Sequence, residues 1–171
     1  MSENPLVDLT IAVNCADWTT ALPDAKALGR RAALAVLGRP TEPVEASLVL
    51  ADDETVRGLN LDYRGRDAPT NVLSFADLDA GQAGKGPKML GDVIIALETT
   101  VREAKEQQKS FADHFSHLVV HGMLHLLGFD HEDNEEADVM ERLETELLAG
   151  LGIMDPYASS GAQDGNGRMD Q

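Results

Sequence analysis

All five histidines of this 171-residue chain lie within one short segment, between residues 114 and 131. His121 and His125 are four residues apart, so on a helix their imidazoles share one face. Gly128 follows at a position where a helix can end in the left-handed conformation that glycine adopts at little cost. The chain can then reverse and return His131 to the same face. The segment therefore predicts three neutral imidazoles that converge on a metal ion.

Three histidine ligands with a fourth position open to water are typical of catalytic zinc sites. We therefore predict one Zn²⁺, bound by His121, His125 and His131, that activates water for hydrolysis. By spacing alone, His117 and His121 form a rival ligand pair. However, His117, His121 and His125 together span two helical turns, about 12 Å, which is too far for one ion to bind all three. The turn at Gly128 favours His131 and leaves His117 a supporting or substrate-side role.

The residue after the first predicted ligand is Gly122, where a zinc metalloprotease helix carries a glutamate as general base. A glycine offers no proton acceptor and would leave open space beside the metal, so peptide hydrolysis lacks one part. Another group must hold the substrate. Arg64, expected in a loop before the third strand, can pair with phosphate, although Arg66 competes and Arg64 could instead pair with Asp67 or cap a turn. Asp130 either accepts a ring N–H from a ligand or caps its turn.

Hydrophobic patterning predicts the elements that must position these residues. Strands are expected over residues 7–13, 46–51, 72–75 and 90–96. Helices are expected over residues 23–37, 98–108, 111–127 and 134–148, with a further short helix that Asp52 begins as N-cap. This order predicts one α+β domain over residues 1–155, in which helices pack on a mixed four-stranded sheet. Its site helix has the metzincin-like pattern H-x-x-x-H-x-x-G-x-x-H of zinc hydrolases.

Composition limits the class of protein. The net charge of −16 argues against broad electrostatic attraction to nucleic acid, which comes from clustered Lys and Arg. No apolar run approaches the roughly 20 residues of a membrane span, and no secretory signal is visible at the N-terminus. The single cysteine, Cys15, fits a reducing compartment. We expect a cytoplasmic protein without DNA or membrane partners, and a disordered polar tail over residues 156–171.

Three motifs follow one another along the chain. They are NLDYRGRDAPTNVLSF at residues 60–75, LGDV at residues 90–93 and HGMLHLLGFDH at residues 121–131. Together they resemble the motifs of the YbeY family of bacterial rRNA-maturation endoribonucleases, over roughly residues 46–150. Asn71 and Phe129 depart from the aspartate and tyrosine that are common in that family, and neither is a predicted ligand.

The resemblance implies a zinc-dependent endoribonuclease that cleaves single-stranded RNA in 16S rRNA 3′-end maturation and ribosome quality control. It implies that His121, His125 and His131 bind the metal and that Arg64 is essential to catalysis. The implied partners are ribosomal RNA and the small ribosomal subunit, with a small-subunit ribosomal protein or an assembly GTPase as further candidates. Two alternatives stay open, a zinc hydrolase of peptides or small esters or amides, and a non-enzymatic ribosome-assembly factor with structural zinc.

Overall fold

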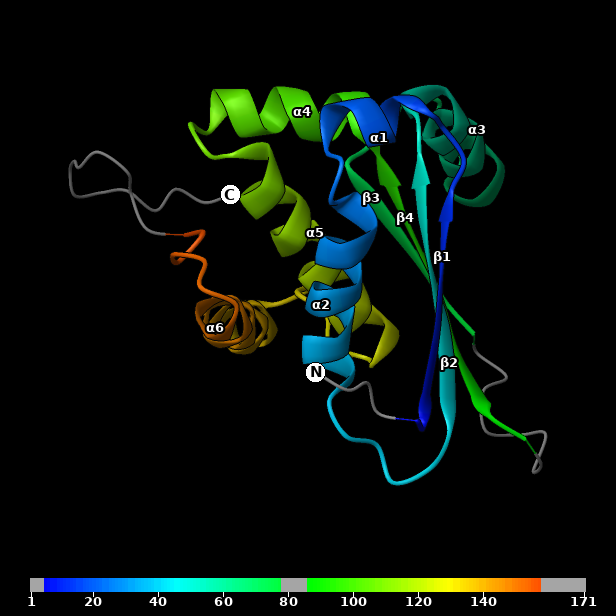
Figure 1. Cartoon of the computed structure of the whole chain (residues 1–171), viewed down its shortest axis with the longest axis vertical. Helices are drawn as coiled ribbons and strands as arrows, with labels where there is room; N and C mark the ends of the chain where they lie inside the picture. Colours follow the sequence, from blue (N-terminus) through cyan, green and yellow to red (C-terminus); the bar gives the residue numbers. More distant parts are fainter. Residues whose placement is uncertain (1–4, 78–85, 158–171) are drawn as a thin grey trace.

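Four strands form a mixed sheet in the order β1-β2-β4-β3 in the computed structural model, which describes residues 5–77 and 86–157 (Figure 1). The strands are β1 (Val7–Val13), β2 (Val44–Ala51), β3 (Val72–Ala76) and β4 (Lys88–Ala96). β1, β2 and β4 run parallel, whereas β3 pairs antiparallel with β4 and forms an edge of the sheet. The predicted mixed four-stranded sheet is confirmed.

The described residues also form six helices. These are α1 (Asp17–Ala21), α2 (Ala25–Leu37), α3 (Asp53–Arg64), α4 (Leu97–Glu106), α5 (Phe111–Leu126) and α6 (Asn134–Gly150). None of the helices in the described ranges is long and apolar enough to cross a bilayer. The helix α1 was not predicted, because its five residues are too few to show a periodic pattern.

The helices cover both faces of the sheet. Successive side chains of a strand point to opposite faces, and in β4 this alternation divides the core. Val93 and Ile95 belong to the large core formed with α2, α5 and α6, whereas Ile94 and Ala96 belong to a smaller cluster that includes Val56 of α3. The helix α3 therefore lies on the face of the sheet opposite α5, and its end must pass the edge strand to approach the histidines.

The position of Arg64 differs from the prediction. Arg64 is the last residue of α3, not a loop residue, and Gly65 ends the helix in the left-handed conformation with φ 70°. Asp52 accepts a hydrogen bond from the Thr55 N–H at 2.9 Å, as its predicted N-cap role requires. The acidic first turn and this cap start a helix that extends to Tyr63 and Arg64, the first two residues expected in the loop.

The site helix α5 begins as predicted, since Ser110 accepts a hydrogen bond from the Asp113 N–H at 3.0 Å. It crosses the sheet at Gly122, where a Cβ atom would lie only 2.6 Å from Val93 Cγ1 and 3.2 Å from Ser74 Oγ. The prediction that Gly122 leaves open space beside the metal is therefore wrong. The glycine instead lets the helix approach β3 and β4 closely, and no glutamate could fit there without displacing it.

We expect Gly122→Ala to destabilise the fold by about 1–3 kcal/mol, because overpacking at this contact outweighs the helix propensity that alanine adds. Gly58→Ala is the matched control, since its helical glycine has no neighbouring atom within 4 Å of the added Cβ. That control should gain up to about 1 kcal/mol. Urea unfolding of both variants measures the difference, and a Gly122→Ala variant as stable as the parent would contradict the close contact.

Candidate metal centre

Three imidazoles converge where α5 ends. The ligand nitrogens of His121, His125 and His131 all lie within 4.8 Å of one another. The first two come from α5, and the third follows a turn at Gly128, whose φ of 102° is the predicted left-handed conformation. This turn is closed by a hydrogen bond from the Phe129 N–H to the Leu124 carbonyl at 3.1 Å. The cluster that the spacing predicted is present in the fold.

Each of the two helical imidazoles is oriented by a group that accepts a hydrogen bond from its Nδ1. His121 Nδ1 lies 2.6 Å from Glu144 Oε2, and His125 Nδ1 lies 2.9 Å from the Phe129 carbonyl oxygen. An ionised carboxylate and a carbonyl accept hydrogen bonds, so each ring donates its Nδ1–H. In a neutral ring the lone pair is then on Nε2, which is the nitrogen that faces the cluster.

The facing nitrogens are arranged as a cation requires. His121 Nε2 and His125 Nε2 are 3.1 Å apart, and two lone pairs at this distance repel unless a positive centre lies between them. Two nitrogens bound tetrahedrally to one Zn²⁺ would be roughly 3.3 Å apart. Burial, reinforced by His121 and His131, lowers the pKa of His125 and keeps that ring neutral. The three residues thus fit a metal ion as ligands.

Glu144, on α6, is the residue that sequence reasoning missed. Its side chain is 1% exposed, and it contacts His117 Nε2 at 2.9 Å as well as His121. It also accepts a hydrogen bond from the Tyr157 hydroxyl. Burial alone would raise the pKa of Glu144, but the hydrogen bonds from His117 and His121 outweigh it and hold the pKa well below the usual value. Glu144 is therefore an ionised acceptor inside the core.

A signal for Glu144 did exist in the sequence. Met140, Glu144 and Leu148 are spaced by four residues, and all three are buried on one face of α6. A charged residue in a buried stripe requires a partner. No local pattern identifies that partner, since His121 is 23 residues away in the chain.

Arg64 reaches the histidine cluster from the opposite side of β3. It lines a cavity of about 600 Å³ together with all three clustered histidines and with Ser74. Its Nη2 donates a hydrogen bond to the Ser74 carbonyl at 3.3 Å, and its guanidinium lies 5.7 Å from the Phe75 ring centroid. Asp67 is paired with Arg57 instead. The structure thus places Arg64 beside the histidine cluster. Asp67, which was the alternative partner for Arg64, forms its ion pair with Arg57.

The other residues weighed from sequence have roles different from metal binding. Arg66 is exposed and does not line the cavity, and His117 is directed to Glu144. Asp130 accepts a hydrogen bond from the His131 backbone N–H at 2.8 Å, so it stabilises the turn. The ring N–H groups of the helical histidines bind Glu144 and the Phe129 carbonyl, and this leaves Asp130 outside that role.

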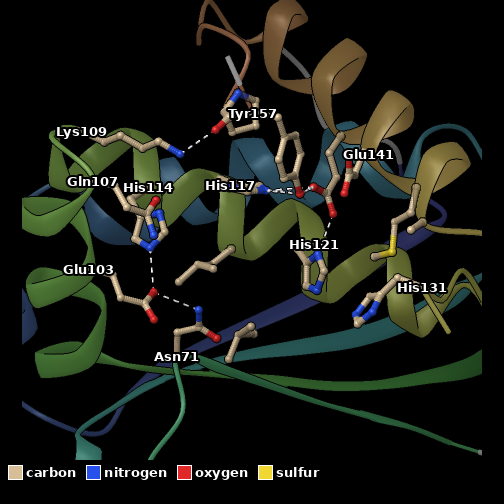
Figure 2. A pocket seen from close by; sticks show the side chains of 16 residues that line it. Asn71, Glu103, Gln107, Lys109, His114, His117, His121, His131, Glu141 and Tyr157 are labelled. Carbon is tan, nitrogen blue, oxygen red and sulfur yellow. Dashed lines mark hydrogen bonds and ion pairs between the residues drawn. The ribbon is translucent and has the colours of Figure 1, made fainter. Parts of the chain in front are cut away.

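The predicted tail begins at residue 156, yet Pro156 and Tyr157 both contact the folded domain. Lys109 Nζ donates a hydrogen bond to the Pro156 carbonyl at 2.8 Å, and the Tyr157 hydroxyl lies 3.3 Å from His117 Nε2 (Figure 2). Burial and the nearby Glu144 carboxylate raise the pKa of Tyr157, so its phenol stays protonated. The remainder of the predicted tail, residues 158–171, lies outside the described residues.

Comparison with known proteins agrees with this site. A family model described as "Endoribonuclease YbeY" matches residues 23–152. The Endoribonuclease YbeY of Paramagnetospirillum magneticum is 58% identical over 157 residues, which cover 88% of this chain and 96% of that protein. The Endoribonuclease YbeY of Bradyrhizobium sp. is 50% identical over 160 residues, which cover 90% of this chain and 93% of that protein.

A solved structure supports the fold alone. The solution structure of TM1509 from Thermotoga maritima matches with a TM-score of 0.51 and 21% identity, and the match covers 91% of this chain and 99% of that one. The identity is too low to transfer a function, but the curated relatives and the family model each span most of the chain. The chain belongs to the YbeY family of endoribonucleases.

Proposed function

We propose that this chain binds one Zn²⁺ through His121, His125 and His131 and cleaves single-stranded RNA, with Arg64 as the residue that binds the phosphodiester. Its proposed cellular role is 16S rRNA 3′-end maturation and ribosome quality control. The relatives are named endoribonucleases, which gives the reaction class. The observation that carries the proposal for this chain is the single cavity lined both by Arg64 and by the three histidines.

Arg64 supplies what phosphoryl chemistry needs from a protein side chain. Its guanidinium is always charged and pairs with phosphate oxygens in fork geometry. The hydrogen bond to the Ser74 carbonyl and the contact with the Phe75 ring hold it at the cavity wall, so little reorganisation is needed to bind an anion. Charge that develops on the phosphate during cleavage is then stabilised by a group already in place.

The imidazole cluster supplies the second part. A divalent ion held there by His121, His125 and His131 would supply a Lewis acid and would lower the pKa of a bound water towards 7. Glu144 and the Phe129 carbonyl fix the tautomers of His121 and His125, which keeps both Nε2 lone pairs directed to the ion site. Gly122 carries no carboxylate, so proton acceptance by a glutamate at that position, as in peptide hydrolysis, is absent from this site.

The position of the cavity suits a single strand of RNA. Its lining includes Ser74 and Ala76 of β3, and β3 is an edge strand of the sheet. The net charge of −16 works against strong RNA binding by this chain alone. We therefore include the small ribosomal subunit in the proposal, as the partner that presents the RNA, with a small-subunit ribosomal protein or an assembly GTPase as the direct contact.

His125→Ala should lose both bound zinc and RNA cleavage, because a two-histidine site holds zinc far more weakly. We expect cleavage to fall by a factor on the order of 100 or more. Zinc content by mass spectrometry and cleavage of a 16S rRNA 3′-end fragment measure the two effects. Leu127→Ala, at an exposed position next to the end of α5, is the control and should retain both. Normal processing by His125→Ala would exclude this ligand assignment.

Arg64→Ala should keep its zinc and lose cleavage by about 10²–10³-fold, the usual effect of removing one group that stabilises transition-state charge. Arg64→Lys should recover part of the activity, since it restores the charge without the fork geometry. Arg66→Ala, two residues further and exposed, is the matched control. Unchanged kcat/KM in Arg64→Ala would remove Arg64 from the reaction.

Glu144→Gln should weaken zinc binding by about 10–100-fold, because an amide cannot accept hydrogen bonds on both of its polar atoms and His121 loses its fixed tautomer. Competition titration with a zinc chelator measures the affinity. Glu146→Gln, on the exposed side of α6, removes the same charge from the chain and should leave the affinity unchanged. Equal affinities for the two variants would show that Glu144 does not orient the ligand.

A further inference from the structure

A second cavity, of about 610 Å³, adjoins the histidine cluster, and most of its lining residues have no role in the chemistry above. It is bounded by residues of α4, α5 and α6 and by Pro156 and Tyr157 (Figure 2). It shares His121 and His131 with the cavity that contains Arg64. A ligand with its charged group at Arg64 and a neighbouring group in this second cavity would therefore extend across the metal centre.

The charge of this second cavity excludes a phosphate group. Glu103, Glu141 and Glu144 line it, against the single cation of Lys109. Burial would raise the pKa of Glu103, but hydrogen bonds from His114 and Asn71 outweigh it and lower that pKa, so the carboxylate is ionised. Hence the cavity repels anions and favours groups that donate hydrogen bonds.

Two buried histidines of this cavity wall orient its carboxylates. His114 and His117 each direct Nε2 to a carboxylate, that of Glu103 at 2.9 Å and that of Glu144 at 2.9 Å. Each ring therefore donates its Nε2–H, and in the neutral ring its Nδ1 is an acceptor. Neither Nδ1 has a hydrogen-bond partner among the described residues, but both atoms are fully buried, so a ligand in the cavity does not reach them. The carboxylates of Glu103 and Glu141 are therefore the charged acceptors of the lining, beside the amides of Asn71 and Gln107 and the ammonium group of Lys109.

Size and apolar surface complete the description of the ligand. The volume lies within the roughly 300–1,000 Å³ of sites for small organic groups. Val72, Leu118 and Met140 give the wall an apolar part, and Tyr157 and His117 contribute rings. Flat heteroaromatic groups bind between such side chains, with hydrogen bonds at their edges.

We propose that this second cavity is a subsite for one nucleobase of the RNA, next to the phosphate at Arg64, and that it favours bases with an exocyclic amino group. Adenine, cytosine and guanine carry such a donor, whereas uracil does not. The inference rests on the proposed endoribonuclease function and adds to it a determinant of where the RNA is cut. The identity of one base beside the cleaved bond should therefore affect the cleavage rate more than the identity of its neighbours.

The test is a series of short RNAs in which each nucleotide around the bond that the zinc-loaded protein cleaves is replaced in turn by uridine or by an abasic ribose. At one position, either replacement of an amino-bearing base should lower kcat/KM by about tenfold, the effect of losing one bound base. Replacements at other positions should have little effect. Equal tolerance at every position would overturn the subsite, whereas absence of cleavage of all RNAs would overturn the proposed function instead.

Variants connect the effect to this cavity. Ala137→Phe places a ring in the cavity from α6, and Asp138→Phe, at the next and exposed position, is its control. The first should cleave the parent RNA about tenfold more slowly and show no additional loss with the abasic RNA. The control should behave as the parent protein in both assays. An Ala137→Phe variant that keeps the full preference for an amino-bearing base would contradict the proposal.

A second pair of variants covers the case in which the phenylalanine disturbs folding. Glu141→Gln keeps the size of a lining side chain but replaces one carboxylate oxygen by a donor, so it should narrow the preference for amino-bearing bases over uracil. Glu146→Gln, exposed on the same helix, should leave the preference unchanged. Zinc content measured in parallel separates this effect from damage to the metal centre, and an unchanged preference in Glu141→Gln would count against the subsite.

Discussion

Glu144 joins three rings from two parts of the chain, His117 and His121 of α5 and Tyr157 after α6. A carboxylate buried without partners costs several kcal/mol, so the fold can keep this one only if those hydrogen bonds are made. Because the partners must be present for the charge to be tolerated, the position of α6 against α5 and the orientation of His121 are coupled. The packing of α6 on α5 and the orientation of the His121 ring therefore depend on the same hydrogen bonds to Glu144.

The sheet imposes a second constraint on the same helix. Gly122 lies between His121 and His125 in α5 and packs directly on Val93 and Ser74. The Ser74 hydroxyl donates a hydrogen bond to the Gly122 carbonyl at 3.1 Å, while the Ser74 carbonyl accepts one from Arg64. One residue of the edge strand thus contacts both the histidine helix and the phosphate-binding candidate. In the sequence, Gly122 looks like the loss of a catalytic base. In the fold, it allows α5 to lie close to β3 and β4.

The two cavities on either side of the histidine cluster differ in charge. The overall charge is strongly negative, and three carboxylates line the cavity under α6. The cavity on the other side contains the Arg64 guanidinium, and a cation bound by the three histidines would add positive charge there. An RNA strand that crosses the histidine cluster would meet positive charge at its phosphate and acceptor groups at its base. Neither the composition nor the net charge of the chain reveals this difference between the two sides.

Local patterns in the sequence determined the main elements, the mixed sheet, and the set of His121, His125 and His131. Spacing of four residues and a glycine turn act within a few residues, so they can be interpreted without knowing the fold. Only the tertiary structure decided that Arg64 borders the cluster, that Glu144 and Tyr157 support it, and that Gly122 is packed tightly. Each of these facts depends on contacts between segments far apart in the chain, and the free energy of such contacts comes from burial and pairing that no local pattern records.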